Sequence, residues 1–304
     1  MSDQHFPSVS VITPFLNGGD WLRQAVESVI AQDYQYWQQI LIDDGSLPEA
    51  TKIAKDYSDR YPGKIIYTEH PGHANKGVTA SRNLGITKAN SQLVAFLDSD
   101  DCWLPDKLRK QVNLFSEYPA ANVICEASKY WFTWEKPNSQ DMMIKVGVEE
   151  NKLYEPPVLI YKLYPLGKGA APCPSGMIMK KTVLDKIGGF EESFTGANQV
   201  YEDQAFLCKI YLTEKVFVSG EANNLYRQRS GSLMQSINQR KQYLKVRAFF
   251  LKWMENYLEQ HNIDDARINK LISQAKFEIK NPNLHLFFAK FRSRIQRLMN
   301  QPNL

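Results

Sequence analysis

The sequence lacks the features of several common protein classes. Its 4 cysteines lie far apart among 304 residues, with no C-x-x-C pair and no histidine at metal-ligand spacing, so a disulfide framework and a zinc site both lack support. The start has no basic segment ahead of an apolar stretch, and no apolar run approaches the ~20 residues that span a bilayer. We therefore expect neither a signal peptide nor a transmembrane helix, and reduced thiols in the cytoplasm.

Two glycine-rich phosphate-binding motifs are also missing. No G-x-G-x-x-G follows the first apolar segment, and no G-x-x-x-x-G-K-[ST] occurs anywhere. The dinucleotide-binding and P-loop interpretations therefore lose their main support. Any diphosphate would have to be bound by a metal ion and by basic side chains.

Charge is mild overall but unevenly distributed. The formal net charge is +4, yet residues 239–304 hold 13 Lys/Arg against 5 Asp/Glu. Such a basic helical tail could contact anionic lipid, which would make the protein peripheral at the inner face of the membrane. Alternatively, its apolar stripe packs on the domain or forms a homodimer. Nothing in the charge pattern favours nucleic-acid binding.

What the sequence does contain is a regular alternation of strands and helices. Val9–Phe15 is β-branched and apolar on both faces, as expected of a buried parallel strand. A helix should follow at 21–32, with Asp20 as its N-cap, and the alternation continues to a strand at 92–98. This pattern predicts an α/β fold with a mostly parallel central sheet flanked by helices. The second half is less regular, and the chain becomes all helix after Gly231.

Carboxylates gather where two predicted strands end. Asp43 and Asp44 follow one strand, and Asp98, Asp100 and Asp101 follow another. Ligands of open α/β sheets bind beyond the carboxyl ends of the strands, and clustered carboxylates need a cation or hydrogen-bond donors to offset their repulsion. Mg²⁺ or Mn²⁺ commonly takes one or two protein carboxylates and completes its shell with water and substrate phosphates. The cluster therefore indicates a metal-bound diphosphate, with a solvated turn as the alternative.

Six segments, taken in order, carry a resemblance to a known family. VSVITPFLNGGDWL, ILIDDGS, GVTASRNLGI, AFLDSDD, GGFEE and YEDQAF resemble the family 2 glycosyltransferases, which have the GT-A (Rossmann-like) fold. The resemblance implies that a sugar is transferred with inversion from a nucleotide-sugar, most often a UDP-sugar, to an acceptor hydroxyl, with the help of Mn²⁺ or Mg²⁺. It also implies a glycan or lipid-linked acceptor and a role in cell-surface polysaccharide or glycolipid synthesis.

The resemblance suggests three regions. Residues 1–233 would be the GT-A domain, with 1–110 as its nucleotide-binding half and 111–233 as its acceptor-side half. Residues 234–304 would be a helical C-terminal extension that the resemblance does not cover.

The resemblance also assigns roles to individual residues. Asp203 would be the general base that takes the proton of the acceptor hydroxyl, and Asp100 would ligate the metal. Donor-nucleotide contacts would come from Thr13, Pro14, Asp43, Asp44, Arg82 and Asp98. Diphosphate or sugar contacts would come from Arg229, Trp103, Ser175 and Glu202.

Each assignment has a structural alternative. Asp43, Asp44 and Ser46 could cap the helix that begins near Pro48, and Arg82 could simply pair with a surface acid. Glu202 and Asp203 could be acids favoured by a helix N-terminus. Trp103 and Ser175 could serve packing alone.

One position departs from the family pattern. Many relatives carry a metal-binding histidine where this chain has Arg229. Arginine cannot ligate a cation, but its guanidinium can clamp a diphosphate directly. Metal dependence could therefore be weaker than the DSDD segment suggests.

Two other functions remain open at this point. A non-catalytic nucleotide-sugar or glycan-binding module could retain the cleft, although Asp203 argues against it. A sugar-phosphate nucleotidyltransferase would require a Gly-rich, arginine-bearing loop after the first strand, and PFLNGGDWL has no arginine before Arg23.

Overall fold

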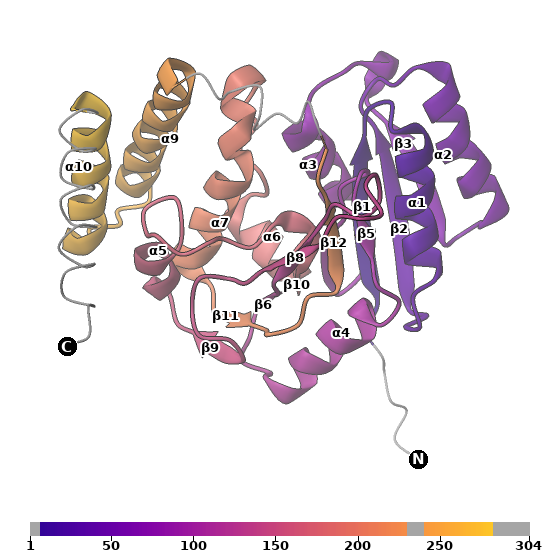
Figure 1. The fold of residues 1–304 in the computed structure, drawn as a ribbon, viewed down its shortest axis with the longest axis horizontal. Helices are drawn as coiled ribbons and strands as arrows, with labels where there is room; N and C mark the ends of the chain where they lie inside the picture. The colour runs from indigo at the N-terminus through magenta and orange to yellow at the C-terminus, as the bar shows by residue number, and fades with distance from the viewer. Residues whose placement is uncertain (1–6, 230–239, 282–304) are drawn as a thin grey trace. The chain divides into compact units, whose positions relative to one another are not determined.

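A computed structural model describes residues 7–229 and 240–281 (Figure 1). The chain divides into two compact units, Met1–Ser236 and Ile237–Leu304. All the described strands belong to the first unit, and the second contributes two described helices.

The first unit is built on a long mixed sheet. Its strands, in sheet order, are β3 (Ile65–Glu69), β2 (Trp37–Asp43), β1 (Val9–Phe15), β4 (Leu93–Phe96), β10 (Met177–Lys180), β6 (Val123–Cys125), β11 (Val216–Val218) and β9 (Lys152–Tyr154). The run from β3 to β4 is parallel throughout, as is the pair β6–β11, whereas β10 is antiparallel to both of its neighbours. The α/β fold class predicted from the alternating pattern is confirmed.

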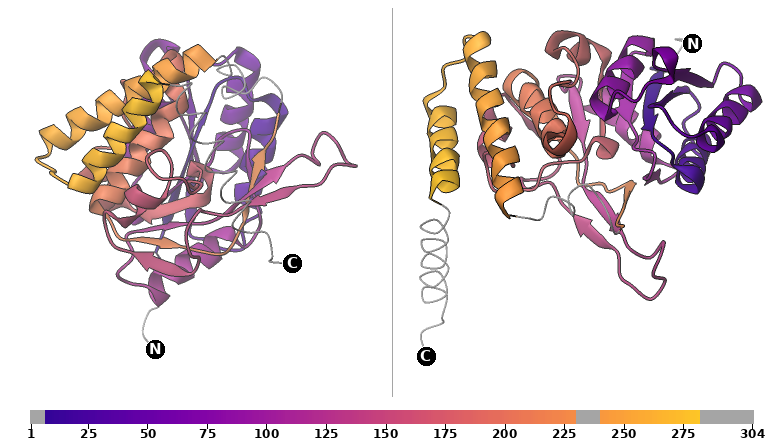
Figure 2. Two further views of the ribbon diagram at one scale, coloured as in Figure 1. Left: turned by 60° about the vertical axis from the view of Figure 1, so that its left-hand side comes forward. Right: turned by 90° about the horizontal axis from the view of Figure 1, so that it is seen from above.

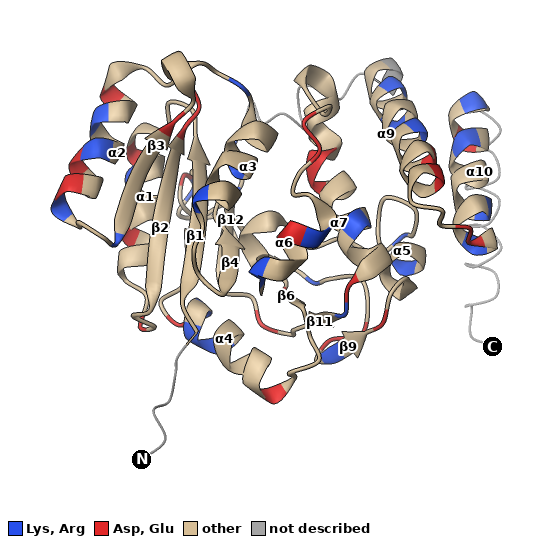
Figure 3. Ribbon diagram, turned by 180° about the vertical axis from the view of Figure 1, so that it is seen from behind, with Lys and Arg blue, Asp and Glu red and all other residues tan. Residues whose placement is uncertain are grey.

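Helices cover both faces of this sheet (Figures 1 and 3). They are α1 (Gly19–Ile30), α2 (Pro48–Arg60), α3 (Val78–Lys88), α4 (Lys107–Glu117), α5 (Val158–Lys162), α6 (Lys181–Ile187) and α7 (Glu202–Thr213), with 3₁₀ turns η1 (Pro71–His73), η2 (Pro174–Gly176) and η3 (Gly196–Tyr201).

Alternate residues of β1 serve the two faces. Val9 and Val11 join the apolar cluster that includes Leu22 of α1. Ile12 points the other way, toward α3, where a Cβ on Gly85 would come within 2.5 Å of its side chain. A glycine at this position therefore lets α3 approach the sheet closely.

A smaller sheet of four strands lies beside the main one. Its order is β5 (Cys102–Trp103), β12 (Asn224–Arg227), β7 (Ser128–Trp131) and β8 (Met142–Ile144). The β7–β8 arm extends away from the rest of the first unit (Figure 2). Strand β12 is antiparallel to β5 and parallel to β7. This sheet is what brings residues 224–229 to the loop that follows β4.

One local prediction needs refinement. The helix α1 begins at Gly19, with Gly18 rather than Asp20 in the N-cap position, and Asp20 lies in the first turn. The segment 121–135 contains two strands, since β6 belongs to the main sheet and β7 to the smaller one.

The second unit contributes α9 (Arg240–Gln260) and α10 (Ala266–Lys280). Asp265 caps α10, since its Oδ1 accepts hydrogen bonds from the backbone N–H groups of Arg267 and Ile268. Lys276 of α10 pairs with Glu255 of α9. The last predicted helix, with its apolar stripe from Leu284 to Leu298, lies outside the described residues. Over the described residues, every helix is too short or too polar to cross a lipid bilayer.

Candidate active site

The loop after β4 carries three aspartates in two different environments. Asp101 is buried, and its carboxylate accepts hydrogen bonds from Ser175 Oγ (2.8 Å) and from the backbone N–H of Arg227 (3.0 Å). Ser175 Oγ in turn accepts the backbone N–H of Asp98 (3.2 Å). Asp101 and Ser175 therefore fix the shape of the loop, while the side chains of Asp98 and Asp100 remain partly exposed.

Asp100 is held by two arginines of the segment at the end of β12. Arg229 Nε lies 3.0 Å from Asp100 Oδ2, and Arg227 Nε donates to the backbone carbonyl of Asp100 at 2.6 Å. Burial, followed by the nearby charge of Asp98, raises the pKa of Asp100, and Arg229 acts in the opposite direction. A cation bound beside Asp100 would offset the repulsion between these two carboxylates.

A divalent cation fits this donor set in one specific way. No cluster of three or more His, Cys, Asp or Glu side chains able to hold a metal occurs among residues 7–229 and 240–281, so the protein has no complete cage there. Asp100 can offer a single carboxylate, and substrate phosphates and water would have to supply the other oxygen ligands. Mg²⁺ and Mn²⁺ are commonly bound in that way beside nucleotides.

Arg82 lies inside the protein between two carboxylates. It is 2% exposed, its Nη1 lies 2.5 Å from Glu202 Oε1, and its Nη2 lies 2.6 Å from Asp98 Oδ1. Burial by itself would lower the pKa of Arg82, but the charges of Glu202 and Asp98 raise it. Arg82 therefore does pair with acids, but inside the protein and not at the surface as the alternative above had it.

The start of α7 places Glu202 and Asp203 beside this ion pair. Glu202 is 8% exposed, and its Oε2 has no hydrogen-bond partner among the residues that the structure describes. Burial raises the pKa of Glu202 to about 7. Asp203 is partly exposed and accepts the backbone N–H of Gln204 at 2.7 Å. Burial raises the pKa of Asp203 to about 6. A carboxylate with that pKa can be ionised at neutral pH and still be basic enough to accept a proton.

The residues at the ends of β1 and β2 are engaged mainly with their own chain. Thr13 is buried, and its Oγ1 accepts a hydrogen bond from Gln39. Asp43 accepts from the Ser46 backbone N–H (2.7 Å), and also from Thr51 Oγ1 and Tyr67 Oη. The predicted N-cap role is not what is found, because the N-cap position of α2 is Leu47 and has no side-chain cap.

Asp44 connects this loop to the one that precedes α3. Its carboxylate accepts the backbone N–H groups of Lys76 (2.7 Å) and Gly77 (3.0 Å). Gly45 has φ +80°, and a Cβ there would lie 2.8 Å from the backbone nitrogen of Asn75. A glycine is therefore required both by the backbone conformation and by the close approach of the two loops. Pro14, at the end of β1, is buried.

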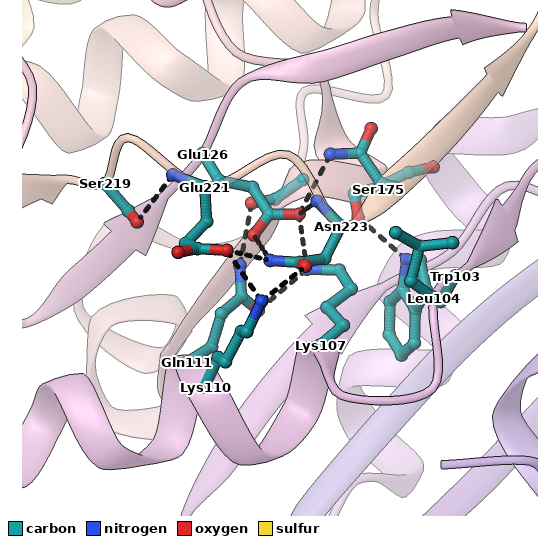
Figure 4. A network of polar contacts seen from close by, with 12 residues as sticks. Trp103, Leu104, Lys107, Lys110, Gln111, Glu126, Ser175, Ser219, Glu221 and Asn223 are labelled. Atoms are coloured by element: carbon teal, nitrogen blue, oxygen red, sulfur yellow. Dashed lines mark hydrogen bonds and ion pairs between the residues drawn. The ribbon is translucent and has the colours of Figure 1, made fainter.

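Trp103 belongs to the interior and not to an exposed wall. Its indole Nε1 donates to the backbone carbonyl of Ser175 at 2.9 Å, and the ring lies 4.9 Å from the Lys107 amine (Figure 4). The side chain is buried, so its face is not available to stack on a sugar. The packing role named as the alternative is the one that this geometry favours.

A charged network under the site gave no signal in the sequence. Lys107 and Glu126 are both fully buried and 3.5 Å apart, and Lys107 also donates to Gln111 Oε1 (Figure 4). Burial lowers the pKa of Lys107. Glu126 accepts the backbone N–H of Asn223. The network thus holds the segment that leads into β12, at positions too far apart in the chain to form a recognisable motif.

Sequence reasoning also missed the surroundings of Arg227. Its guanidinium lies 4.4 Å from the ring of Trp131, 4.7 Å from Trp134 and 5.9 Å from Trp21, and its Nη2 donates to Gln24. Arg229 lies 5.1 Å over Trp21. The sequence indicated this arrangement only through the two arginines of YRQRS. Their spacing of two residues would place both side chains on one face of a strand.

The family model for Glycosyl transferase family 2 matches residues 10–188. The chain belongs to this family. Among curated relatives, a Bacillus subtilis protein named for teichuronic acid biosynthesis, glycosyltransferase TuaG, is 38% identical over 117 residues. The match covers 38% of this chain and 44% of the relative, so the chain spans less than half of that protein.

Solved structures of similar fold include two nucleotide-sugar complexes. S. aureus TarS 1–349 in complex with UDP-GlcNAc has a TM-score of 0.63 and 19% identity, covering 91% of this chain and 73% of TarS 1–349. The mannosyltransferase PcManGT from Pyrobaculum calidifontis, in complex with GDP-Man and Mn²⁺, has a TM-score of 0.57 and 16% identity, covering 91% of this chain and 70% of that one. The expected GT-A fold and family membership are both confirmed.

Proposed function

We propose that this glycosyltransferase transfers a sugar from a nucleotide-sugar to an acceptor hydroxyl with inversion at the anomeric carbon, and that Asp203 is the general base. The observation that carries the proposal is the Glu202–Arg82–Asp98 ion pair. It joins the start of α7, where Asp203 lies, to the loop that carries Asp100. The two chemical functions that the reaction needs, a base and a site for the leaving diphosphate, are thereby linked in one part of the fold.

The protein's own groups would act as follows. The Asp203 carboxylate accepts the proton of the acceptor hydroxyl as the oxygen attacks the anomeric carbon from the side opposite the leaving diphosphate, which inverts that carbon. Arg229, which is partly exposed beside Asp100, donates hydrogen bonds to the diphosphate. Asp100 would hold the cation. A bound Mn²⁺ or Mg²⁺ would supply Lewis-acid stabilisation of the charge on the departing diphosphate.

The donor nucleotide would lie over the loops that follow β1, β2 and β4. In this role Asp43 and Asp44 act mainly by shaping the loops at 44–47 and 75–77, since their carboxylates accept hydrogen bonds from those segments and their neighbours. Thr13, Pro14 and Asp98 would border the same region. A UDP-sugar is our first choice of donor because the TarS neighbour is in complex with UDP-GlcNAc, and a GDP-sugar is the second because of PcManGT.

The acceptor is proposed to be a glycan or a lipid-linked glycan of a cell-surface polysaccharide. The support is the similarity to a protein named for teichuronic acid biosynthesis. Residues 111–233 would form the acceptor side and 234–304 an extension. We also predict that the protein lies in the cytoplasm or at the inner face of the membrane. Contact of the C-terminal helices with lipid or with a second copy of the chain stays a prediction.

The first experiment identifies the donor. Thermal unfolding is measured with UDP-, GDP-, dTDP- and CMP-sugars, with and without Mn²⁺, because a ligand that binds the native state raises the melting temperature. We expect one nucleotide class to raise it, and more so with Mn²⁺. With that donor, release of nucleoside diphosphate is then compared between the parent and Asp203→Asn. Equal release by both proteins would contradict the assignment of the base.

A further inference from the structure

One guanidinium connects three segments that are distant in sequence. Arg82 comes from α3, Asp98 from the loop after β4, and Glu202 from the start of α7, 120 residues farther along the chain. The guanidinium also lies 5.0 Å from the ring of Phe190. The planar fork of arginine suits this arrangement, because its two terminal nitrogens can each engage a different carboxylate at a fixed angle.

Arg82 is buried, and its two terminal nitrogens each face a carboxylate of the protein, so little of the guanidinium is open to a substrate. Nη1 and Nη2 point at Glu202 and Asp98. Nε is buried and has no hydrogen-bond partner in the part of the chain that the structure describes. A nucleotide could reach this guanidinium only by displacing one of the two carboxylates, which would then be left without its counter-charge in a buried place.

We propose that Arg82 is a positioning residue and not a donor ligand: it fixes the start of α7, and with it Asp203, relative to the loop that carries Asp100. The inference rests on the proposed function, since it takes Asp203 as the base and Asp100 as the diphosphate site. The family resemblance implied that Arg82 contacts the nucleotide. In the role proposed here, Arg82 instead aligns Asp203 with the loop that carries Asp100.

The same arginine acts on the charge of Asp203. The groups that face Asp203 are Arg82 from α3, Asp98 from the loop after β4, and Glu202, Cys208 and Tyr211 from its own helix. Burial raises the pKa of Asp203, Asp98 acts in the same direction, and Arg82 lowers it. Arg82 is the cation in this set. Its loss would therefore keep Asp203 protonated, and inactive as a base, to a higher pH.

The test compares Arg82→Lys and Arg82→Met in the full chain, using the donor found by thermal shift. For Arg82→Met we expect kcat to fall by at least about tenfold, because small displacements of a catalytic group are costly. The donor KM and Kd should change by less than about threefold. The acid limb of the kcat/KM pH profile should move up by about half a pH unit or more. Arg82→Lys retains the positive charge, so the acid limb of its kcat/KM pH profile should stay at the parental pH although kcat falls.

Two further variants keep the test decisive. Arg109→Met removes an exposed arginine that pairs with Asp33 on the surface, and it should match the parent in every measurement. If Arg82→Met does not fold, Arg82→Met is combined with Glu202→Gln, which removes one of the uncompensated carboxylates. The acid limb of this double variant should then lie at higher pH than that of Glu202→Gln alone.

The outcomes separate the inference from the proposed function. A rise of tenfold or more in donor Kd with kcat preserved would show that Arg82 is a donor ligand, and would overturn the inference. So would a kcat and an acid limb that match the parent, provided that Asp203→Asn has lost its activity in the same assay. If Asp203→Asn is as active as the parent, the proposed function fails, and the inference with it.

Discussion

Two pairs of neighbouring aspartates follow two strands of the same parallel sheet, and the fold uses them differently. Asp43 and Asp44, after β2, receive hydrogen bonds from backbone and side-chain donors of the chain itself. Asp100 and Asp101, after β4, differ from each other, because Asp101 is buried and fully engaged inside the loop while the Asp100 carboxylate is partly exposed beside Arg229. An acidic pair at a strand end can thus be wholly engaged in loop structure or leave one carboxylate partly exposed.

The largest effect should come from the exposed member of the second pair. Asp100→Ala removes the carboxylate that would hold the cation, so we expect kcat/KM to fall by about two to three orders of magnitude, the usual cost of losing charge stabilisation at a leaving group. The melting temperature should be unchanged or higher, because repulsion with Asp98 is relieved. Steady-state release of nucleoside diphosphate measures the first quantity. Asp59→Ala, at an exposed position on α2, is the control.

In the pair after β2, substitution should cost stability more than activity. Asp43→Ala leaves the Ser46 N–H and the Thr51 hydroxyl without this acceptor, whereas the Tyr67 hydroxyl keeps Glu69. The loss should lower the free energy of unfolding by about 2 kcal/mol. Urea unfolding followed by tryptophan fluorescence measures this loss, with exposed Glu49→Ala as the matched control. An Asp43→Ala protein of parental stability but with donor binding abolished would reverse the comparison.

The activity should depend on pH through the ionisation of Asp203. Asp203 has a pKa raised to about 6 by burial, and only its ionised form accepts a proton. Below pH 6, kcat/KM should therefore fall by about tenfold per pH unit, and it should level off as the pH rises above 6. The residual activity of Asp203→Asn should lack this limb. A parental profile that is flat from pH 5 to 7 would remove Asp203 from the mechanism.

The smallest change is expected at Arg229. Arg229→His replaces a diphosphate clamp by a possible metal ligand at the position where many relatives carry histidine, and Asp100 Oδ2 is 3.0 Å from the arginine Nε. We expect stimulation by Mn²⁺ to increase by about two- to threefold, because a second ligand strengthens cation binding. Activity is titrated with Mn²⁺ for both proteins. Lower stimulation by Mn²⁺ in the variant than in the parent would mean that the side chain at position 229 does not lie beside the metal ion.

Local periodicity was enough to predict the strand and helix pattern at the start of the chain. The strand Val9–Phe15 was predicted with the bounds of β1, and the helix predicted at 21–32 overlaps most of α1. The carboxylates after β2 and β4 could be placed at the sheet's edge for the same reason, since parallel strands end together. Each of these inferences depends on residues within a few positions of one another.

The features that could not be predicted depend on long-range contacts. The partners of Arg82 are 16 and 120 residues away, and Arg227 binds the backbone of Asp100 across 127 residues. No spacing rule anticipates such pairs. Trp103 shows the same limit, because its position after the aspartates suggested an exposed aromatic, whereas pairing of β5 with β12 turns it into the core. Burial of a side chain is a property of the assembled sheets.

The most direct test of the account is single-turnover transfer by Asp203→Asn, with donor binding measured on the same samples. The account predicts a donor Kd within about threefold of the parent and a transfer rate at least about a hundredfold lower, since general-base catalysis contributes about 10²–10⁴. A variant that transfers the sugar within about threefold of the parental rate would contradict the central claim.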